Sequence, residues 1–244
     1  MLDRERLPVE VHANFGIPKA FVATARDVSK IWKAFHDAAM DVNATANCVD
    51  GLVRHFESCE SLVQYENPQR AAITSLEISA RCREPYQTGE VSLGGRYSAP
   101  VSISLRGEET MVSAIRTTLM DTIDGMKPWY SRVSTIDLFY VWYPIFMVLF
   151  LLARTMTPSD TPTPAIPFAK AVVLVAKLLA LMATIGGVIW GIAALRKRYF
   201  PIATFAIGQG ASRHQHNEQV RWVVMVGFLV GVVASIVATM LLAA

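Results

Sequence analysis

The sequence predicts an α+β cytosolic domain, an antiparallel sheet with helices on one face, followed by three transmembrane α-helices. Short runs that alternate apolar and polar residues are interspersed with amphipathic runs of helical period in the first half of the chain. The strand-like runs follow one another too closely for parallel crossovers, so hairpins are expected. From residue 134 onwards the chain is dominated by long apolar runs. These observations divide the chain into a cytosolic domain, 1–133, and a membrane part, 134–244.

Strands are predicted where the period of two is clearest, at 9–15, 40–48, 52–57, 74–82 and 99–105. Each such run presents an apolar face to a core. The other face is rich in Ser, Thr, Asn and charge, which is typical of a solvated surface, and the alternative is a surface for a ligand or partner.

The connections are predicted from turn residues. Asp50-Gly51 and Gly94-Gly95 have the composition of two-residue hairpin turns. Pro100 has no N–H to donate to a ladder, so it predicts a strand at the edge of the sheet or a bulge.

Three helices are expected in the domain. Thr24 with Asp27 has the pattern of a capping box, Ser58 caps a short helix, and 108–124 has helical period with Glu108 and Glu109 in its first turn. The apolar face of the first helix is Val28, Ile31, Trp32 and Phe35.

The membrane part begins with the run Leu138–Ala153, which contains no charged residue. About 16 residues at 1.5 Å each reach roughly 24 Å, close to the thickness of a bilayer core. Transmembrane helices are therefore expected over 134–154, 168–195 and 222–244. They are joined by a Pro/Thr-rich external loop, 155–167, and a basic cytoplasmic loop, 196–221.

Several residues have the chemistry of a membrane interface. Lys177 precedes the basic cluster at the end of its helix by roughly 28 Å of helix, so its ammonium can reach one surface while the cluster lies at the other. The alternative for Lys177 is a residue of an ion pathway. The expected interface residues are Lys177, Arg196, Lys197, Arg198, Trp142 and Trp222.

Charge placement predicts the orientation. Residues 1–133 hold 15 Lys/Arg and 17 Asp/Glu, and the remainder holds 8 and 3, so the positive charge belongs to the membrane part. This distribution argues against nucleic-acid binding. The positive-inside rule places the domain and 196–221 in the cytoplasm and the carboxyl terminus outside. The amino terminus lacks the apolar region of a secretory signal, which agrees with this orientation. The expected location is a bacterial inner membrane.

Small residues recur every fourth position in the second and third predicted spans. Such faces let two backbones approach closely in lipid. Either the two helices pack within one subunit, or at least one face packs between subunits of a homo-oligomer. The residues concerned are Gly187, Gly191, Gly227, Gly231, Ser235 and Thr239.

The loop before the last span has two candidate features. Ser212 and Gln215 have capping-box spacing and predict the start of the helix. The glycines of 207–210 allow an anion site, but an interfacial turn with Phe205 among the lipid headgroups is the favoured interpretation.

No metal site, cofactor or catalytic residue is predicted. Cys48, His55, Cys59 and Cys82 do not have the spacing of a standard zinc site, and an odd number of cysteines is typical of free thiols in a reducing compartment. Nucleophile elbows, paired carboxylates at helical spacing and dinucleotide fingerprints are absent.

The leading functional hypothesis is a membrane-anchored, oligomeric interaction or sensing module whose domain binds a protein or a small ligand. A second hypothesis is an oligomeric pore or membrane-perturbing effector, of a bacterial defence or stress type, gated by the domain. A third is an enzyme with an active site around His12, His55 or His214.

Overall fold

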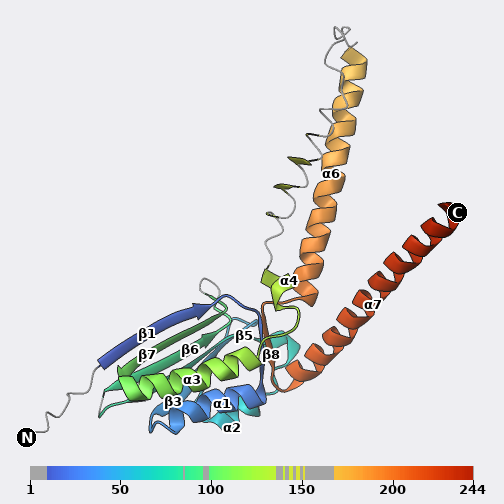
Figure 1. Cartoon of the computed structure of the whole chain (residues 1–244). Coiled ribbons are helices and arrows are strands. Elements are labelled where there is room, and N and C mark those ends of the chain that lie inside the picture. The colour runs from blue at the N-terminus through green and yellow to red at the C-terminus, as the bar shows by residue number, and fades with distance from the viewer. Residues whose placement is uncertain are drawn as a thin grey trace, which may run out of the picture. The chain divides into compact units, whose positions relative to one another are not determined.

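The computed structural model describes residues 10–84, 86–95, 99–135 and 168–243, together with a few single positions between 140 and 151 (Figure 1). The chain forms two compact units. One comprises residues 1–132 with 201–244, and the other comprises residues 133–200.

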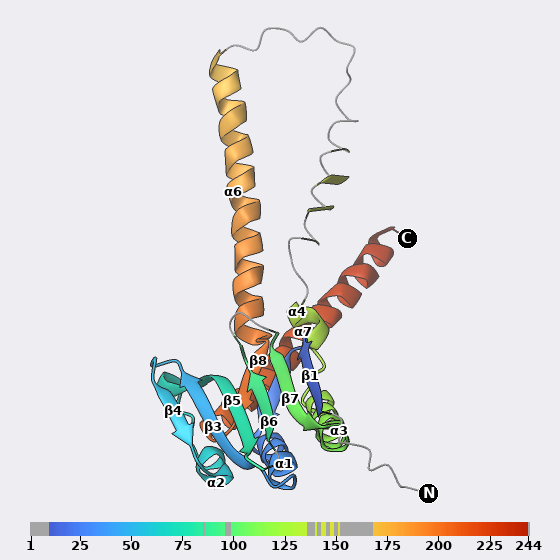
Figure 2. The same cartoon turned by 90° about the vertical axis from the view of Figure 1, so that its left-hand side faces the viewer.

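A six-stranded antiparallel sheet dominates the first unit, in the order β1-β7-β6-β5-β3-β4 (Figures 1 and 2). Every neighbouring pair is antiparallel, as the closely spaced strand patterns predict. A second, two-stranded sheet joins β2 to β8. The strands are β1 Glu10–Ile17, β2 Phe21–Thr24, β3 Asp41–Cys48, β4 Val53–Phe56, β5 Ile73–Cys82, β6 Gln87–Leu93, β7 Val101–Glu108 and β8 Ala203–Ala206.

The helices of the domain lie along one face of this sheet, which confirms the predicted α+β architecture (Figure 2). They are α1 Ala25–His36, α2 Cys59–Val63, the 3-10 turn η1 Gln69–Ala71 and α3 Glu109–Gly125. The remaining helices are α4 Ser131–Thr135, α6 Phe168–Tyr199 and α7 Gln209–Ala243.

The start of α1 has the capping box that the sequence predicts. The Thr24 hydroxyl accepts from the Asp27 N–H at 3.3 Å, and the Asp27 carboxylate accepts from the Thr24 N–H at 3.2 Å. Two N–H groups of the first turn are thereby satisfied. The face predicted to be apolar is buried as a unit: Val28, Ile31, Trp32 and Phe35.

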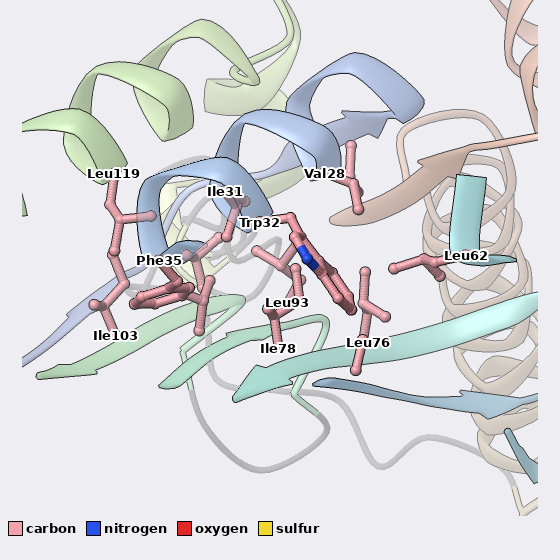
Figure 3. Close-up of a cluster of buried hydrophobic side chains, with 14 of the residues drawn as sticks. Val28, Ile31, Trp32, Phe35, Leu62, Leu76, Ile78, Leu93, Ile103 and Leu119 are labelled. Carbon is pink, nitrogen blue, oxygen red and sulfur yellow. The ribbon is translucent and has the colours of Figure 1, made fainter. Parts of the chain in front are cut away.

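The core lies between these helices and the sheet (Figure 3). Leu62 of α2 and Leu119 of α3 are fully buried, and so are the sheet residues that they face. Burying each such side chain contributes about 1.5–3 kcal/mol. The sheet residues labelled in the close-up are Leu76, Ile78, Leu93 and Ile103.

The outer face of the sheet is polar, and its small side chains bond across the strands. Asn47 donates to the Ser75 hydroxyl at 2.9 Å, and the Ser79 hydroxyl donates to Asn43 at 2.6 Å. Both pairs join β3 to β5, so the polar residues of this face stabilise its strand pairing.

Two predictions about the β6–β7 hairpin are wrong. Gly94-Gly95 is not a two-residue turn, because Leu93 pairs with Val101 and the connection therefore runs over 94–100. Pro100 does not mark an edge either, since β7 lies between β1 and β6. Pro100 precedes the strand, where a missing N–H leaves the ladder intact.

Within the described residues, one helix is long and apolar enough to cross a membrane. It is α7, over Gln209–Ser235. The predicted second span, 168–195, is helical within α6. The predicted first span and external loop, 134–154 and 155–167, lie outside the described residues except for a few positions.

Candidate functional site

The segment before α7 completes the fold of the α+β domain. β8 pairs in parallel with β2, with Phe21 opposite Ala203. The Phe21 N–H donates to the Ile202 carbonyl at 2.9 Å, and the rings of Phe21 and Phe205 meet edge to face at 5.7 Å. Phe205 is 5% exposed and belongs to the domain core, so the expectation that it inserts among lipid headgroups is wrong.

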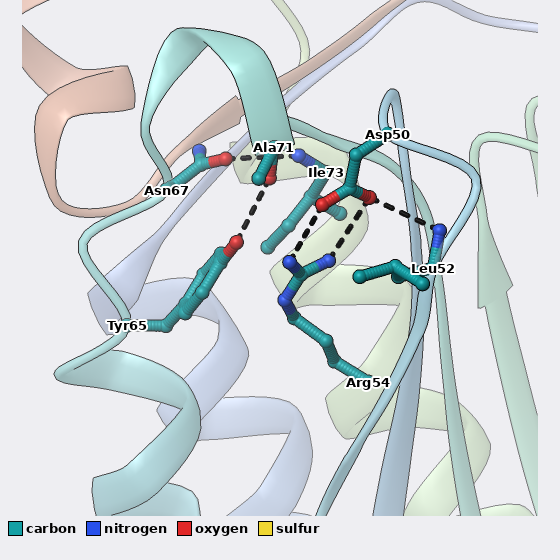
Figure 4. A network of polar contacts seen from close by, with 7 residues as sticks. All are labelled: Asp50, Leu52, Arg54, Tyr65, Asn67, Ala71 and Ile73. Carbon is teal, nitrogen blue, oxygen red and sulfur yellow. Dashed lines mark hydrogen bonds and ion pairs between the residues drawn. The ribbon is translucent and has the colours of Figure 1, made fainter.

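Asn67 joins this segment to the domain, and both the nitrogen and the oxygen of its side-chain amide form hydrogen bonds. Its nitrogen donates to the carbonyls of Phe205 at 3.1 Å and Ile207 at 3.3 Å. Its oxygen accepts from the Ile73 N–H at 2.9 Å, as Figure 4 shows. The Asn67 carbonyl accepts from Arg213 of α7 at 2.6 Å. Asn67 is 1% exposed, and a buried amide that lost these partners would be costly.

The two glycines of this segment allow its close approach to the domain. Gly208 has φ +49°, and a Cβ there would lie 2.5 Å from the Glu66 carbonyl oxygen. That same oxygen accepts from the Gln209 N–H at 2.7 Å. A Cβ at Gly210 would lie 2.6 Å from the Asn67 amide nitrogen of the domain and would also meet the Phe205 backbone. Contact with the domain therefore accounts for both glycines without an anion site.

The helix begins earlier than the sequence pattern predicts. α7 starts at Gln209, so Ser212 lies inside its first turn and is not the N-cap. The Ser212 hydroxyl donates to the Gln209 carbonyl at 3.1 Å. The bond from Gln209 to Glu66 holds the helix start against the domain and satisfies an N–H that a cap would otherwise bind.

A polar and aromatic cluster on α7 contacts the segment between α3 and α4. Trp129 donates its indole N–H to Glu218 at 2.6 Å, and Arg221 forms an ion pair with Glu218. The Arg221 guanidinium lies 4.1 Å from the centre of the Tyr130 ring. Trp129 also contacts Trp222, with ring centres 5.7 Å apart. Burial raises the pKa of the Tyr130 phenol.

A second network supports the Asn67 loop from the β3–β4 hairpin (Figure 4). The Tyr65 hydroxyl donates to the Ala71 carbonyl at 2.8 Å, which fixes the loop that carries Asn67. The guanidinium of Arg54 lies 5.6 Å from the Tyr65 ring centre and binds both oxygens of Asp50, at 3.1 and 2.7 Å. The hydrogen bonds from Arg54 lower the pKa of Asp50.

The predicted helix-packing residues lie on the two long helices. Gly187 and Gly191 are on α6, and Gly227, Gly231 and Ser235 are on α7. A Cβ added at any of the four glycines would meet no described atom within 4 Å. Thr239 is within α7, but its side chain lies outside the described residues.

The predicted interface residues are divided between the same helices. Arg196, Lys197 and Arg198 form the last turn of α6, and Trp222 is half exposed beside Trp129. Lys177 lies within α6 with its side chain outside the described residues, and Trp142 lies outside them altogether.

The histidines proposed for an active site lie on separate elements. His12 is on β1 beside the Ser104 hydroxyl at 3.5 Å, His55 is on β4 beside the Thr45 hydroxyl at 3.2 Å, and His214 is on α7. The described part of the chain contains no group of three or more His, Cys, Asp or Glu that could hold a metal ion. Cys48 is buried, and Cys59 and Cys82 are half buried.

Sequence reasoning misses the residues of this junction. Asn67 precedes a proline, a pattern that predicts only a helix end. Glu218 and Arg221 have the i,i+3 spacing of a local ion pair, which gives no hint of Trp129 or Tyr130. One usable signal is a Glu–Arg pair at the polar start of an otherwise apolar helix, because such charges need a partner at the water boundary.

Comparison with protein-family models, with curated proteins and with solved structures found no match.

Proposed function

We propose that this protein is a membrane-anchored interaction or sensing module, whose α+β domain reports the binding of a partner or ligand to the membrane through α7. The chain is proposed to cross a bacterial inner membrane three times, over 134–154, 168–195 and 222–244. The domain would be cytoplasmic and the carboxyl terminus external.

The β2–β8 pairing supports the proposed number of crossings. Residues 203–206 pair with residues 21–24, so both segments lie on the same side of any membrane. The chain between them must then cross an even number of times. If the charge-free run Leu138–Ala153 spans, the helix α6 is the segment that returns.

The junction supports a start of the last span at Trp222. Arg213 and Arg221 bind the domain and do not lie free at a lipid surface. From Trp222 to the end of α7, about 22 residues rise roughly 33 Å, enough for a bilayer core. The positive-inside bias then depends mainly on the cluster Arg196–Arg198.

The observation that carries the sensing proposal is the bonding of Asn67. A single buried amide binds the domain backbone at Ile73 and also the segment before α7, at Phe205 and Ile207. Because these bonds are made only in one arrangement of the two segments, a shift of the Asn67 loop must move the start of α7 or break them.

Hydrogen–deuterium exchange of the full chain in nanodiscs tests this coupling. Asn67→Ala is expected to raise exchange in 201–213, because the Phe205 and Ile207 carbonyls of this segment lose their partner. Asn43→Ala, which removes an amide from the outer sheet face, is the matched control and should leave 201–213 unchanged. Unchanged exchange in the Asn67 variant would contradict the coupling.

Cysteine labelling in intact cells tests the membrane arrangement. Ser159→Cys in the proposed external loop should react with an impermeant maleimide before lysis, and Glu57→Cys in the domain only after lysis. The parent chain is the control for the native cysteines. Labelling in the opposite order would overturn the orientation, and a chain that stays in solution without detergent would overturn the anchoring.

A further inference from the structure

Strand β1 is a long, regular edge of the main sheet. It spans Glu10–Ile17, pairs with β7 on one side, and no described strand lies on its other side. The opposite edge is protected differently, because β4 is short and its neighbour β3 has a register shift at Asn47 and Cys48. An unprotected eight-residue edge is a template for adding a strand.

The apolar face of β1 is incompletely covered. Val11, Ala13 and Phe15 face the core but are only half buried, whereas Ile103 and Leu105 on the adjacent β7 are 0% and 1% exposed. A further strand beside β1 would cover these side chains. The edge therefore offers both free backbone groups and apolar surface.

A groove runs between this edge and helix α3. Its volume is 500 Å³, and its walls include Val11, Phe15, Val112 and two charged residues of α3, Glu109 and Arg116. Glu109 follows Glu108, which pairs with Glu10, so it lies at the Val11 end. Arg116 lies at the other end, with its guanidinium 5.6 Å from the Phe15 ring centre. Within the described residues neither of the two charges has an ion-pair partner.

We propose that the β1 edge binds the β1 edge of a second copy of this chain, antiparallel, about a two-fold axis at Ala13. This register places Val11 opposite Phe15 of the second copy on the core face, and His12 opposite Asn14 on the outer face. Side chains of like character share each face, and no two like charges are opposed. The result is one continuous sheet across both copies.

The charges of α3 favour a second copy of the chain as the partner, and they favour this register. Glu109 lies beside Val11 and Arg116 beside Phe15, so the axis at Ala13 brings Glu109 of each copy to Arg116 of the other. Glu109 and Arg116 are seven positions apart, a rise of about 10 Å along the helix, which is comparable with the spacing of about 13 Å between Val11 and Phe15 along the strand. A two-fold axis at Asn14 would keep the apolar and polar side chains on the same faces of the sheet, but Glu109 of one copy would no longer lie opposite Arg116 of the other. The proposal does not depend on the membrane anchoring or on the coupling through Asn67.

Disulfide trapping of the full chain in a mild detergent tests the contact. Ala13→Cys is expected to form a homodimer under mild oxidation, and mass spectrometry should identify a disulfide that joins position 13 of one copy to position 13 of the other. His55→Cys, on the exposed opposite edge β4, is the matched control and should remain monomeric like the parent chain. A monomeric Ala13→Cys chain, or a disulfide to a different protein, would overturn the proposal.

Charge reversal tests the register independently. Glu109→Arg and Arg116→Glu, both at exposed positions, should each lower the trapped dimer at least threefold, and the double reversal should restore it. Circular dichroism of each variant checks that the domain is folded. Unchanged dimer in both single variants, or loss in the double variant with the fold intact, would contradict the proposed register.

Discussion

The guanidinium of Arg221 lies 4.1 Å from the centre of the Tyr130 ring, and the Arg221 side chain is completely buried. An arginine of the long helix α7 thus lies against an aromatic ring of the α+β domain. Glu218, one turn earlier, supplies the opposite charge. Both charges belong to α7, and the Tyr130 ring and the Trp129 indole N–H join them to the domain. Separating helix and domain would therefore break the cation–π contact and the hydrogen bond from Trp129 to Glu218.

Replacing Arg221 by methionine should loosen this junction while keeping most of the side-chain volume. We expect a loss of about 1–3 kcal/mol in the free energy of unfolding of the domain, from the lost cation–π contact and charge-assisted hydrogen bond. Urea unfolding of the full chain in detergent, followed by tryptophan fluorescence, measures this loss. Arg221→Lys should recover only part of the loss, because an ammonium lacks the planar stacking surface; full recovery would argue against ring stacking.

The Tyr130 phenol should make the domain sensitive to alkali. Burial raises its pKa above the ordinary value of 10.0, so the protonated form is favoured in the folded state. The resulting stabilisation is complete below pH 10.0 and is lost as the pH rises through the folded-state pKa. Above that pH, the midpoint temperature of thermal unfolding should therefore fall less steeply for Tyr130→Phe than for the parent chain. Parallel curves would contradict this assignment.

Gly208 should not tolerate a side chain. Its φ of +49° disfavours any L residue, and a Cβ would lie 2.5 Å from the Glu66 carbonyl. Gly208→Ala is expected to cost more than about 1 kcal/mol and to raise hydrogen exchange in β8. Gly51→Ala also has a positive φ but meets no atom within 4 Å, so it isolates the backbone strain from the clash. Equal effects in the two variants would remove the clash from the explanation.

The capping box of α1 gives a local measure of domain stability. Thr24→Ala removes the hydroxyl that accepts from Asp27 and should lower the free energy of unfolding by about 1 kcal/mol. Thr24→Ser keeps the oxygen and should stay within a few tenths of the parent chain. Urea unfolding compares the two variants, and equal destabilisation by serine and alanine would contradict a stabilising role for the hydroxyl.

The sequence predicts the strands and helices that are long enough to show a periodic pattern of apolar residues. The period of two gives β1, β3 and β5, and the capping box together with i, i+3, i+4 spacing gives α1. Each of these elements is long enough for its own side chains to express a period. The membrane helices remain predictions, because an apolar run indicates the length of a helix but not whether lipid or protein surrounds it.

The junction could not be predicted because its parts are short and far apart. β2 and β8 are four residues each, too short to show a period, and they pair across most of the chain. Asn67 bonds backbone carbonyls, which carry no sequence pattern of their own. The glycines at 208 and 210 are visible, but nothing local says that a distant carbonyl is what approaches them.

The pairing of β2 with β8 also dictates an order of events during synthesis. When the ribosome has made β1 to α3, the neighbour of β2 does not yet exist, and both the run Leu138–Ala153 and α6 must emerge first. Until β8 is made, β2 and the Phe21 ring lack their partners, so a chain that stops before Ala203 would leave this part of the domain open to proteases.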